Sequence, residues 1–174
     1  SFLWVGRLDK EQKRPHLVLD VAEQLRSHSF RIAGPAEGHG EYAQRIVDRA
    51  ESMENVEYLG LVPPEEIHSE YRRARALINT SAYEGFSNTF LEAWRQGTPV
   101  VSLTVDPARY LHTEKNIAKA TGDLEALVDR CRKLAVDAEY WSRLSKLSLD
   151  SFENNYTIDT VADKYAKALE SALE

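Results

Sequence analysis

Residues 76–103, ALINTSAYEGFSNTFLEAWRQGTPVVSL, have the pattern of one complete strand–helix–strand unit. The apolar run at 76–80 predicts a strand. Ser87 stands where it would cap a helix that continues to Gln96 and ends at Gly97. A second apolar run, at 99–103, predicts the next strand. Because a helix joins them, the two strands are expected to be parallel, with a right-handed crossover.

The same alternation extends towards the start of the chain. Apolar runs at 2–5, 30–33 and 56–59 predict three further strands, and a helical pattern follows each of them. The third of these helices is expected to start at Pro63-Pro64, followed by acidic residues that suit a helix amino terminus. The repeated alternation predicts an α/β fold: a Rossmann-like, doubly wound parallel sheet of about five to six strands with helices on both faces.

The last third of the sequence has no strand pattern and carries three amphipathic stretches. The first and the last have these apolar positions: Leu124, Leu127, Val128, Cys131 and Leu134, then Ile158, Val161, Ala162, Tyr165 and Leu169. We expect extra carboxyl-terminal helices that pack on the sheet and on each other. With no internal repeat and no low-complexity linker, residues 1–174 are predicted to form a single domain.

Composition excludes several classes of protein. With 43% hydrophobic and 29% charged residues, the chain is an ordinary globular sequence. Its net charge of -6, with both signs interspersed, argues against nucleic-acid binding. No apolar run is long enough for a transmembrane segment. The single cysteine, Cys131, excludes an internal disulfide and favours the reducing cytoplasm. Because the chain opens inside a strand pattern, we expect an excised domain.

Ligands of open parallel sheets bind at the carboxyl ends of the strands, which here selects the loops at 6–14, 34–40, 60–64 and 82–88. The first of these combines a glycine, Gly6, that lets a ligand approach the backbone with two cations, Arg7 and Lys13. Arg7 and Lys13 are predicted on exposed loops, where they suit the oxygens of one phosphate group. The alternative is a basic loop that serves only solubility.

The loop at 82–88 and the helix after it combine acids with a helix start. Free amides of Phe86, Ser87, Asn88 and Thr89 would form an anion site. Glu84 precedes this site and Glu92 lies about one turn inside the helix, so both suit sugar or ribose hydroxyls rather than phosphate. The alternative is two ordinary surface acids. The chain contains no dinucleotide fingerprint, phosphate loop, serine elbow or metal-ligand spacing.

Taken together, these segments resemble the carboxyl-terminal domain of retaining glycosyltransferases of the GT-B fold, specifically family 4. Gly6-Arg7 with Lys13 matches the family's basic loop, and Glu84-Gly85-Phe86 with Glu92 matches its glutamate-x7-glutamate signature. Gly-Thr-Pro-Val-Val at 97–101 follows at the family's spacing. The resemblance covers nearly the whole chain, and its motifs are specific as an ordered set.

The resemblance implies a role for each matching residue. Arg7 and Lys13 would hold the donor diphosphate and Glu84 the sugar hydroxyls, which makes these three the catalytic set. Glu92 would accept from the ribose hydroxyls, and the turn at Val62 would meet the base through its backbone. The donor-binding set is Gly6, Val62, Gly85, Phe86, Ser87, Asn88, Thr89 and Glu92. No metal and no cofactor are implied.

The implied function is transfer of a hexose, with mannose as one candidate, from a UDP- or GDP-sugar to a glycan, lipid or other acceptor. An amino-terminal acceptor-binding domain would be the partner, so this chain alone is expected to be inactive. It would act in the cytoplasm, or at the inner face of the membrane through the missing domain. Two alternatives stay open: a non-transferase GT-B relative, such as a sugar-nucleotide epimerase or a phosphorylase-like enzyme, and a regulatory domain that binds nucleotide sugar.

Two segments depart from the family pattern. Val-Asp-Pro at 105–107 stands where family members often carry Gly-Gly, and it resembles a subgroup that suggests mannosyl transfer from a guanosine donor. The segment 109–121 lacks the expected glycines.

Overall fold

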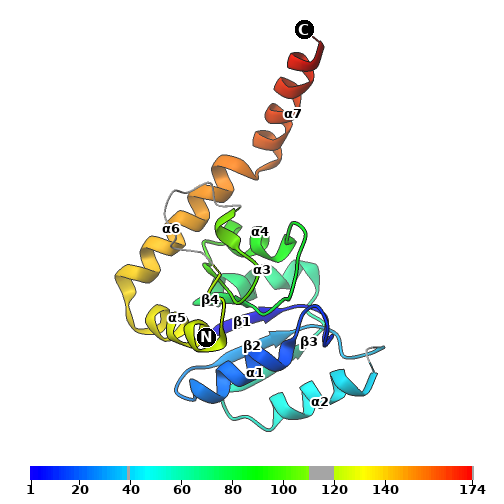
Figure 1. Cartoon of the computed structure of the whole chain (residues 1–174), viewed down its shortest axis with the longest axis vertical. Helices are drawn as coiled ribbons and strands as arrows, with labels where there is room; N and C mark the ends of the chain where they lie inside the picture. The colour runs from blue at the N-terminus through cyan, green and yellow to red at the C-terminus, as the bar shows by residue number, and fades with distance from the viewer. Residues whose placement is uncertain (39, 110–119, 174) are drawn as a thin grey trace.

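The centre of the protein is a parallel sheet, seen in a computed structural model that describes residues 1–38, 40–109 and 120–173 (Figure 1). Among these residues the strands are β1 (Phe2–Val5), β2 (Phe30–Ala33), β3 (Val56–Gly60), β4 (Ala76–Asn79) and β5 (Val100–Ser102). The sheet order is β3-β2-β1-β4-β5, and every neighbouring pair is parallel. The predicted α/β fold is confirmed, with five strands placed within two residues of the predicted positions.

Helices cover both faces of this sheet. The helices of the described residues are α1 (Pro15–Gln24), α2 (Gly40–Glu51), α3 (Pro64–Arg73), α4 (Asn88–Arg95), the short 3-10 helix η1 (Pro107–Arg109), α5 (Leu124–Val136), α6 (Ala138–Asn155) and α7 (Ile158–Leu173). Successive side chains of a strand point to opposite faces. Phe2 and Trp4 therefore join a core with α1, α2 and α5, while Leu3 joins a second core with α3 and α4.

The strand order reverses beside β1. In open parallel sheets ligands bind at the carboxyl ends of the strands next to such a reversal, and this side of the sheet is the ligand edge. The chain first runs outwards from β1 through β2 to β3, and then returns to place β4 on the other side of β1. The helices that follow β1 and β4 therefore cover opposite faces, while the loops that lead into them meet at the carboxyl ends of the strands. These are the two loops in which the sequence places the candidate cations and Glu84.

The carboxyl-terminal helices follow the prediction only in part. In α5 the predicted stripe is buried from Leu127 to Leu134, and burial of Cys131 raises the pKa of its thiol to about 12. The expected packing of the last stripe is wrong, because Ile158, Tyr165 and Leu169 of α7 are largely exposed. Helix α7 extends beyond the end of α6 and away from the sheet (Figure 1), so the described residues leave most of this stripe uncovered. No helix within these residues is long and apolar enough to cross a membrane.

Gly34 holds β1 and β2 together at the ligand edge. A Cβ atom at this position would overlap the backbone carbonyl oxygen of Gly6. Replacing Gly34 with alanine is therefore expected to force the ends of β1 and β2 apart and to lower the free energy of unfolding by about 2–3 kcal/mol. Denaturant unfolding measures this loss. The control is Gly85→Ala, because a Cβ at Gly85 meets no atom within 4 Å. Equal stability of the two variants would contradict the close approach.

Candidate functional site

The loop after β1 is fixed to the end of β4 through Lys13 and Thr80. The buried Thr80 hydroxyl accepts a hydrogen bond from Trp4 Nε1 at 2.9 Å and donates to the backbone oxygen of Lys13 at 2.7 Å. Arg14 follows in the left-handed region, with φ 51°, and its Nε donates to the backbone oxygen of Thr80 at 2.8 Å. These contacts hold the backbone of Lys13 directly beside the loop that carries Glu84.

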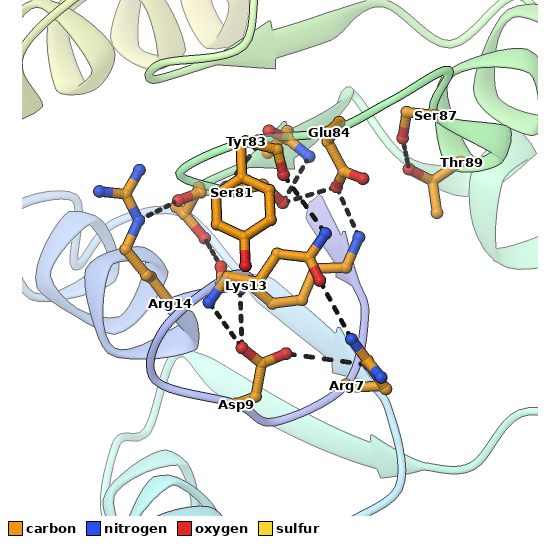
Figure 2. Close-up of polar contacts among 12 residues, drawn as sticks. Arg7, Asp9, Lys13, Arg14, Ser81, Tyr83, Glu84, Ser87 and Thr89 are labelled. Atoms are coloured by element: carbon orange, nitrogen blue, oxygen red, sulfur yellow. Dashed lines mark hydrogen bonds and ion pairs between the residues drawn. The ribbon is translucent and has the colours of Figure 1, made fainter.

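Lys13 and Glu84, 71 positions apart in the sequence, form an ion pair (Figure 2). The distance from Lys13 Nζ to Glu84 Oε1 is 2.5 Å, and Ser81 Oγ donates to the same carboxylate oxygen at 2.7 Å. The two charged side chains are only 16% and 9% exposed. The predicted exposure of Lys13 is therefore wrong, because the loop after β4 covers its side chain.

Arg7 lies at the rim of the site and stays exposed, as predicted, with 61% of its side chain open to solvent. Its Nη2 donates to Gln12 Oε1 at 3.0 Å. Asp9 shapes the same loop, because its Oδ1 accepts from the backbone amides of Gln12 and Lys13 at 2.7 and 3.1 Å (Figure 2). Sequence reasoning missed Asp9, although an aspartate that bonds backbone amides a few residues on is a common turn-forming device.

The second loop leads into helix α4, which begins at Asn88. Ser87 occupies the predicted N-cap position, but its side chain makes no capping hydrogen bond within the described residues. Its hydroxyl instead pairs with Thr89 Oγ1 at 2.9 Å (Figure 2), so the predicted side-chain cap is wrong. Phe86 is half exposed, and its ring lies 5.5 Å from that of Tyr156. Neighbouring Gly85 borders open space in which a ligand could approach the backbone.

A pocket of about 370 Å³ lies beside these loops, at the ends of β1, β2 and β3. Gly6, Val62 and Glu92 of the predicted donor-binding set line it, together with Arg7 of the predicted catalytic set. The other lining residues, which sequence reasoning did not assign, are Val5, Ala33, Gly34, Pro35, Leu61, Pro64, Ile67 and His68. Most of them are apolar, which suits the flat faces of a nucleoside. A somewhat larger hollow of about 430 Å³ borders α1 and the end of α2 and includes no predicted site residue.

Glu92 reaches this pocket from α4 and is held by a tyrosine of α3. The hydroxyl of Tyr71 donates to Glu92 Oε2 at 2.8 Å. Burial, reinforced by the Glu92 carboxylate, raises the pKa of Tyr71 well above its ordinary value. The phenol therefore keeps its proton and remains a hydrogen-bond donor at neutral pH.

The predicted site residues thus fall into two neighbouring groups. Lys13, Glu84 and the start of α4 lie at the ends of β1 and β4, while Val62 and Glu92 lie around the pocket. Gly6 and Arg7 belong to the loop of the first group and line the pocket of the second. The predicted departure at 109–121 lies mostly outside the described residues. The site therefore offers cations, hydroxyl acceptors and an apolar pocket along one edge of the sheet.

Comparison with known proteins gives consistent results. A family model described as glycosyl transferases group 1 matches residues 1–137. The O-antigen chain mannosyltransferase C of Escherichia coli is 26% identical over 178 residues, which cover 99% of this chain and 47% of that protein. The chain thus spans about half the length of this relative.

Solved glycosyltransferase structures share the fold. Sucrose-phosphate synthase from Thermosynechococcus elongatus matches with a TM-score of 0.82 at 18% identity, over 99% of this chain and 45% of that one. Anabaena Alr3699/HepE, solved in complex with UDP, matches with a TM-score of 0.81 at 18% identity, over 98% and 48%. Because the family model matches most of its residues, the chain belongs to the glycosyl transferases group 1 family.

Proposed function

We propose that this chain is the donor-binding domain of a retaining, family 4 hexosyltransferase and binds a UDP- or GDP-hexose. The Lys13–Glu84 ion pair is the observation that carries the proposal. In a nucleotide sugar the anomeric carbon is bonded directly to the diphosphate. A cation for the diphosphate must therefore lie next to an acceptor for the sugar hydroxyls, and these two side chains are in contact.

The nucleoside end of the donor fits the pocket beside this pair. Its apolar lining suits the base and the turn at Val62 offers backbone groups to it, while the Glu92 carboxylate suits the ribose hydroxyls. Arg7 lies at the pocket rim in the same loop as Lys13, where the diphosphate would connect the two ends. Backbone amides from Gly85 through Thr89 would complete the site around the phosphate and sugar oxygens.

The catalytic contribution of this half would be electrostatic. As the bond between sugar and diphosphate breaks, negative charge grows on the leaving nucleotide, and Arg7, Lys13 and the amino terminus of α4 would stabilise it. These groups supply the positive charge that a metal ion would otherwise bring, so we expect a transfer that needs no metal or other cofactor. Glu84 would orient the sugar for the reaction.

The relatives bear on which sugar and which nucleotide the donor contains. Mannosyl transfer by the E. coli relative favours a mannose donor, and the UDP complex of the Anabaena protein favours a uridine nucleotide. An amino-terminal half would bring the acceptor, a glycan or a lipid, and residues 1–174 would lack turnover without it. We expect the protein to act in the cytoplasm, at the inner face of the membrane if that half attaches there.

The proposed function predicts that residues 1–174 bind a nucleoside diphosphate unaided and that the two glutamates differ. Glu92→Gln is expected to weaken binding of the plain nucleoside diphosphate and of the nucleotide sugar by similar factors, because the ribose is common to both. Glu84→Gln is expected to affect only the sugar-bearing donor. Each lost charge-assisted contact corresponds to about 1.5–3 kcal/mol. Calorimetry with UDP, UDP-glucose, GDP and GDP-mannose measures all these affinities.

The controls lie in the same experiment. Asp150→Asn removes an exposed carboxylate of α6, outside the site, and is expected to leave every affinity unchanged. Absence of saturable heat with UDP and GDP at millimolar concentrations would contradict the proposed function. If Glu84→Gln lowered the affinity for both ligand types equally, the assignment of Glu84 to the sugar hydroxyls would be wrong.

A further inference from the structure

The two motif glutamates lie in different surroundings, and Glu92 depends on a residue outside the motif. The hydroxyl of Tyr71 reaches from α3 to Glu92 Oε2 at 2.8 Å. Among the described residues, Tyr71 is the one hydrogen-bond partner of the Glu92 carboxylate, and it occupies only the Oε2 oxygen. The other oxygen, Oε1, remains available as an acceptor on a residue that lines the pocket.

Tyr71 itself is rigidly held. Its ring is fully buried among Leu3, Phe90 and Trp94, and its backbone oxygen accepts a hydrogen bond from the buried Thr98 hydroxyl at 2.7 Å. A long glutamate side chain at a pocket wall has several rotamers, and binding a ligand with it costs the free energy of selecting one. Because the Tyr71 hydroxyl is fixed in the core, its hydrogen bond selects one Glu92 rotamer before the ligand binds.

We propose that Tyr71 is a positioning residue, which orients the Glu92 carboxylate so that Oε1 faces the vicinal hydroxyls of the donor ribose. The ring of Tyr71 packs in the core, whereas its hydroxyl positions a side chain of the binding site. The inference rests on the proposed function, because it assumes a nucleotide in the pocket. The role is confined to the nucleoside end, since the structure places Glu84 with Lys13 and Ser81 instead.

Tyr71→Phe tests this role, because it deletes the hydroxyl and keeps the ring. Calorimetry is expected to show about tenfold weaker binding of both UDP and UDP-glucose, or of the matching guanosine pair, which corresponds to ~1.4 kcal/mol. The matched control is Tyr42→Phe, which removes a part-buried hydroxyl that bonds His16 at 2.7 Å outside the pocket. Its affinities are expected to equal those of the wild type.

A double-mutant cycle separates positioning from mere stability. If Tyr71 acts through Glu92, adding Tyr71→Phe to Glu92→Gln is expected to cause little further loss of affinity, whereas a purely structural effect would add in full. Glu92→Asp tests the contact from the other side without touching the core. It withdraws the carboxylate from Tyr71 and is expected to weaken the binding of both ligands. This variant provides a test even if Tyr71→Phe fails to fold.

The outcomes distinguish the inference from the proposed function. If the wild type binds neither UDP nor GDP, the proposed function is wrong and the positioning role is wrong with it. If the wild type binds and Tyr71→Phe binds equally well, only the positioning role is wrong. If Glu92→Asp binds equally well, the positioning role is wrong and so is the assignment of Glu92 to the ribose. Additive losses in the cycle, or a loss confined to the sugar-bearing ligand, would also overturn it.

Discussion

Lys13→Met is expected to weaken binding of UDP or GDP by about 100-fold, or ~2.7 kcal/mol, and to destabilise the fold at the same time. The affinity falls because the variant removes a cation proposed to contact the diphosphate. The stability falls because the Glu84 carboxylate, 9% exposed, loses its cationic partner and retains the hydrogen bond from Ser81. Breaking a buried ion pair in this way costs about 3–5 kcal/mol. Calorimetry and thermal unfolding measure the two effects separately.

A second substitution separates these two contributions. In Lys13→Met/Glu84→Gln the unpaired charge is gone, so most of the lost stability is expected to return, while nucleoside diphosphate binding stays weak. Arg7→Ala is the matched control, because this cation is 61% exposed. It is expected to weaken binding with little change in melting temperature. If the double variant regained affinity along with stability, Lys13 would be a structural residue rather than a ligand of the diphosphate.

Arg31→Met is expected to lower the free energy of unfolding by about 3–5 kcal/mol. Arg31 of β2 pairs with Glu70 Oε2 of α3 through Nη1, and its Nη2 donates to the backbone oxygen of Glu70 at 3.0 Å. The two side chains are only 7% and 13% exposed. At about 2–4 °C per kcal/mol for a chain of this size, the melting temperature should fall by roughly 6–20 °C.

The other ion pair of Glu70 provides the control for this prediction. Arg73 approaches Glu70 Oε1 at 3.2 Å, but 70% of its side chain is exposed. Arg73→Met is therefore expected to cost no more than about 1 kcal/mol. Replacing both Arg31 and Glu70 by methionine should restore much of the stability, because no charge is left buried without a partner. Equal melting of Arg31→Met and Arg73→Met would contradict a special contribution of the buried pair.

The Arg31–Glu70 pair also concerns the site, because it anchors the helix that forms one wall of the pocket. Pro64, Ile67 and His68 of α3 line this pocket, and Tyr71 follows Glu70 directly. Loosening α3 from β2 would therefore shift the residues that surround the proposed nucleoside. We therefore expect Arg31→Met to lower the affinity for nucleotide as well as the free energy of unfolding.

Local patterns in the sequence were enough to predict the fold and to select the segments of the candidate site. Alternating apolar runs and helical stripes depend on neighbours in the chain, so the five strands and the helix starts at Pro64 and Asn88 agree with prediction to within a residue or two. The rule that ligands bind at the carboxyl ends of parallel strands then selected the loops of Gly6 and Glu84. The ordered motifs indicated which residues in these loops resemble those of a glycosyltransferase, and the family match supports a protein of this class.

What the pattern could not predict is which of these side chains touch. The contacts of Lys13 with Glu84 and of Tyr71 with Glu92 join residues 71 and 21 positions apart. They depend on the strand order, which brings the loops after β1 and β4 together, and on the packing of α3 against α4. The same reason explains the error at α7, because an apolar stripe predicts a buried face only where another segment reaches it. Periodicity is a property of one segment, whereas burial and pairing are properties of two, and only the folded arrangement brings the second segment into place.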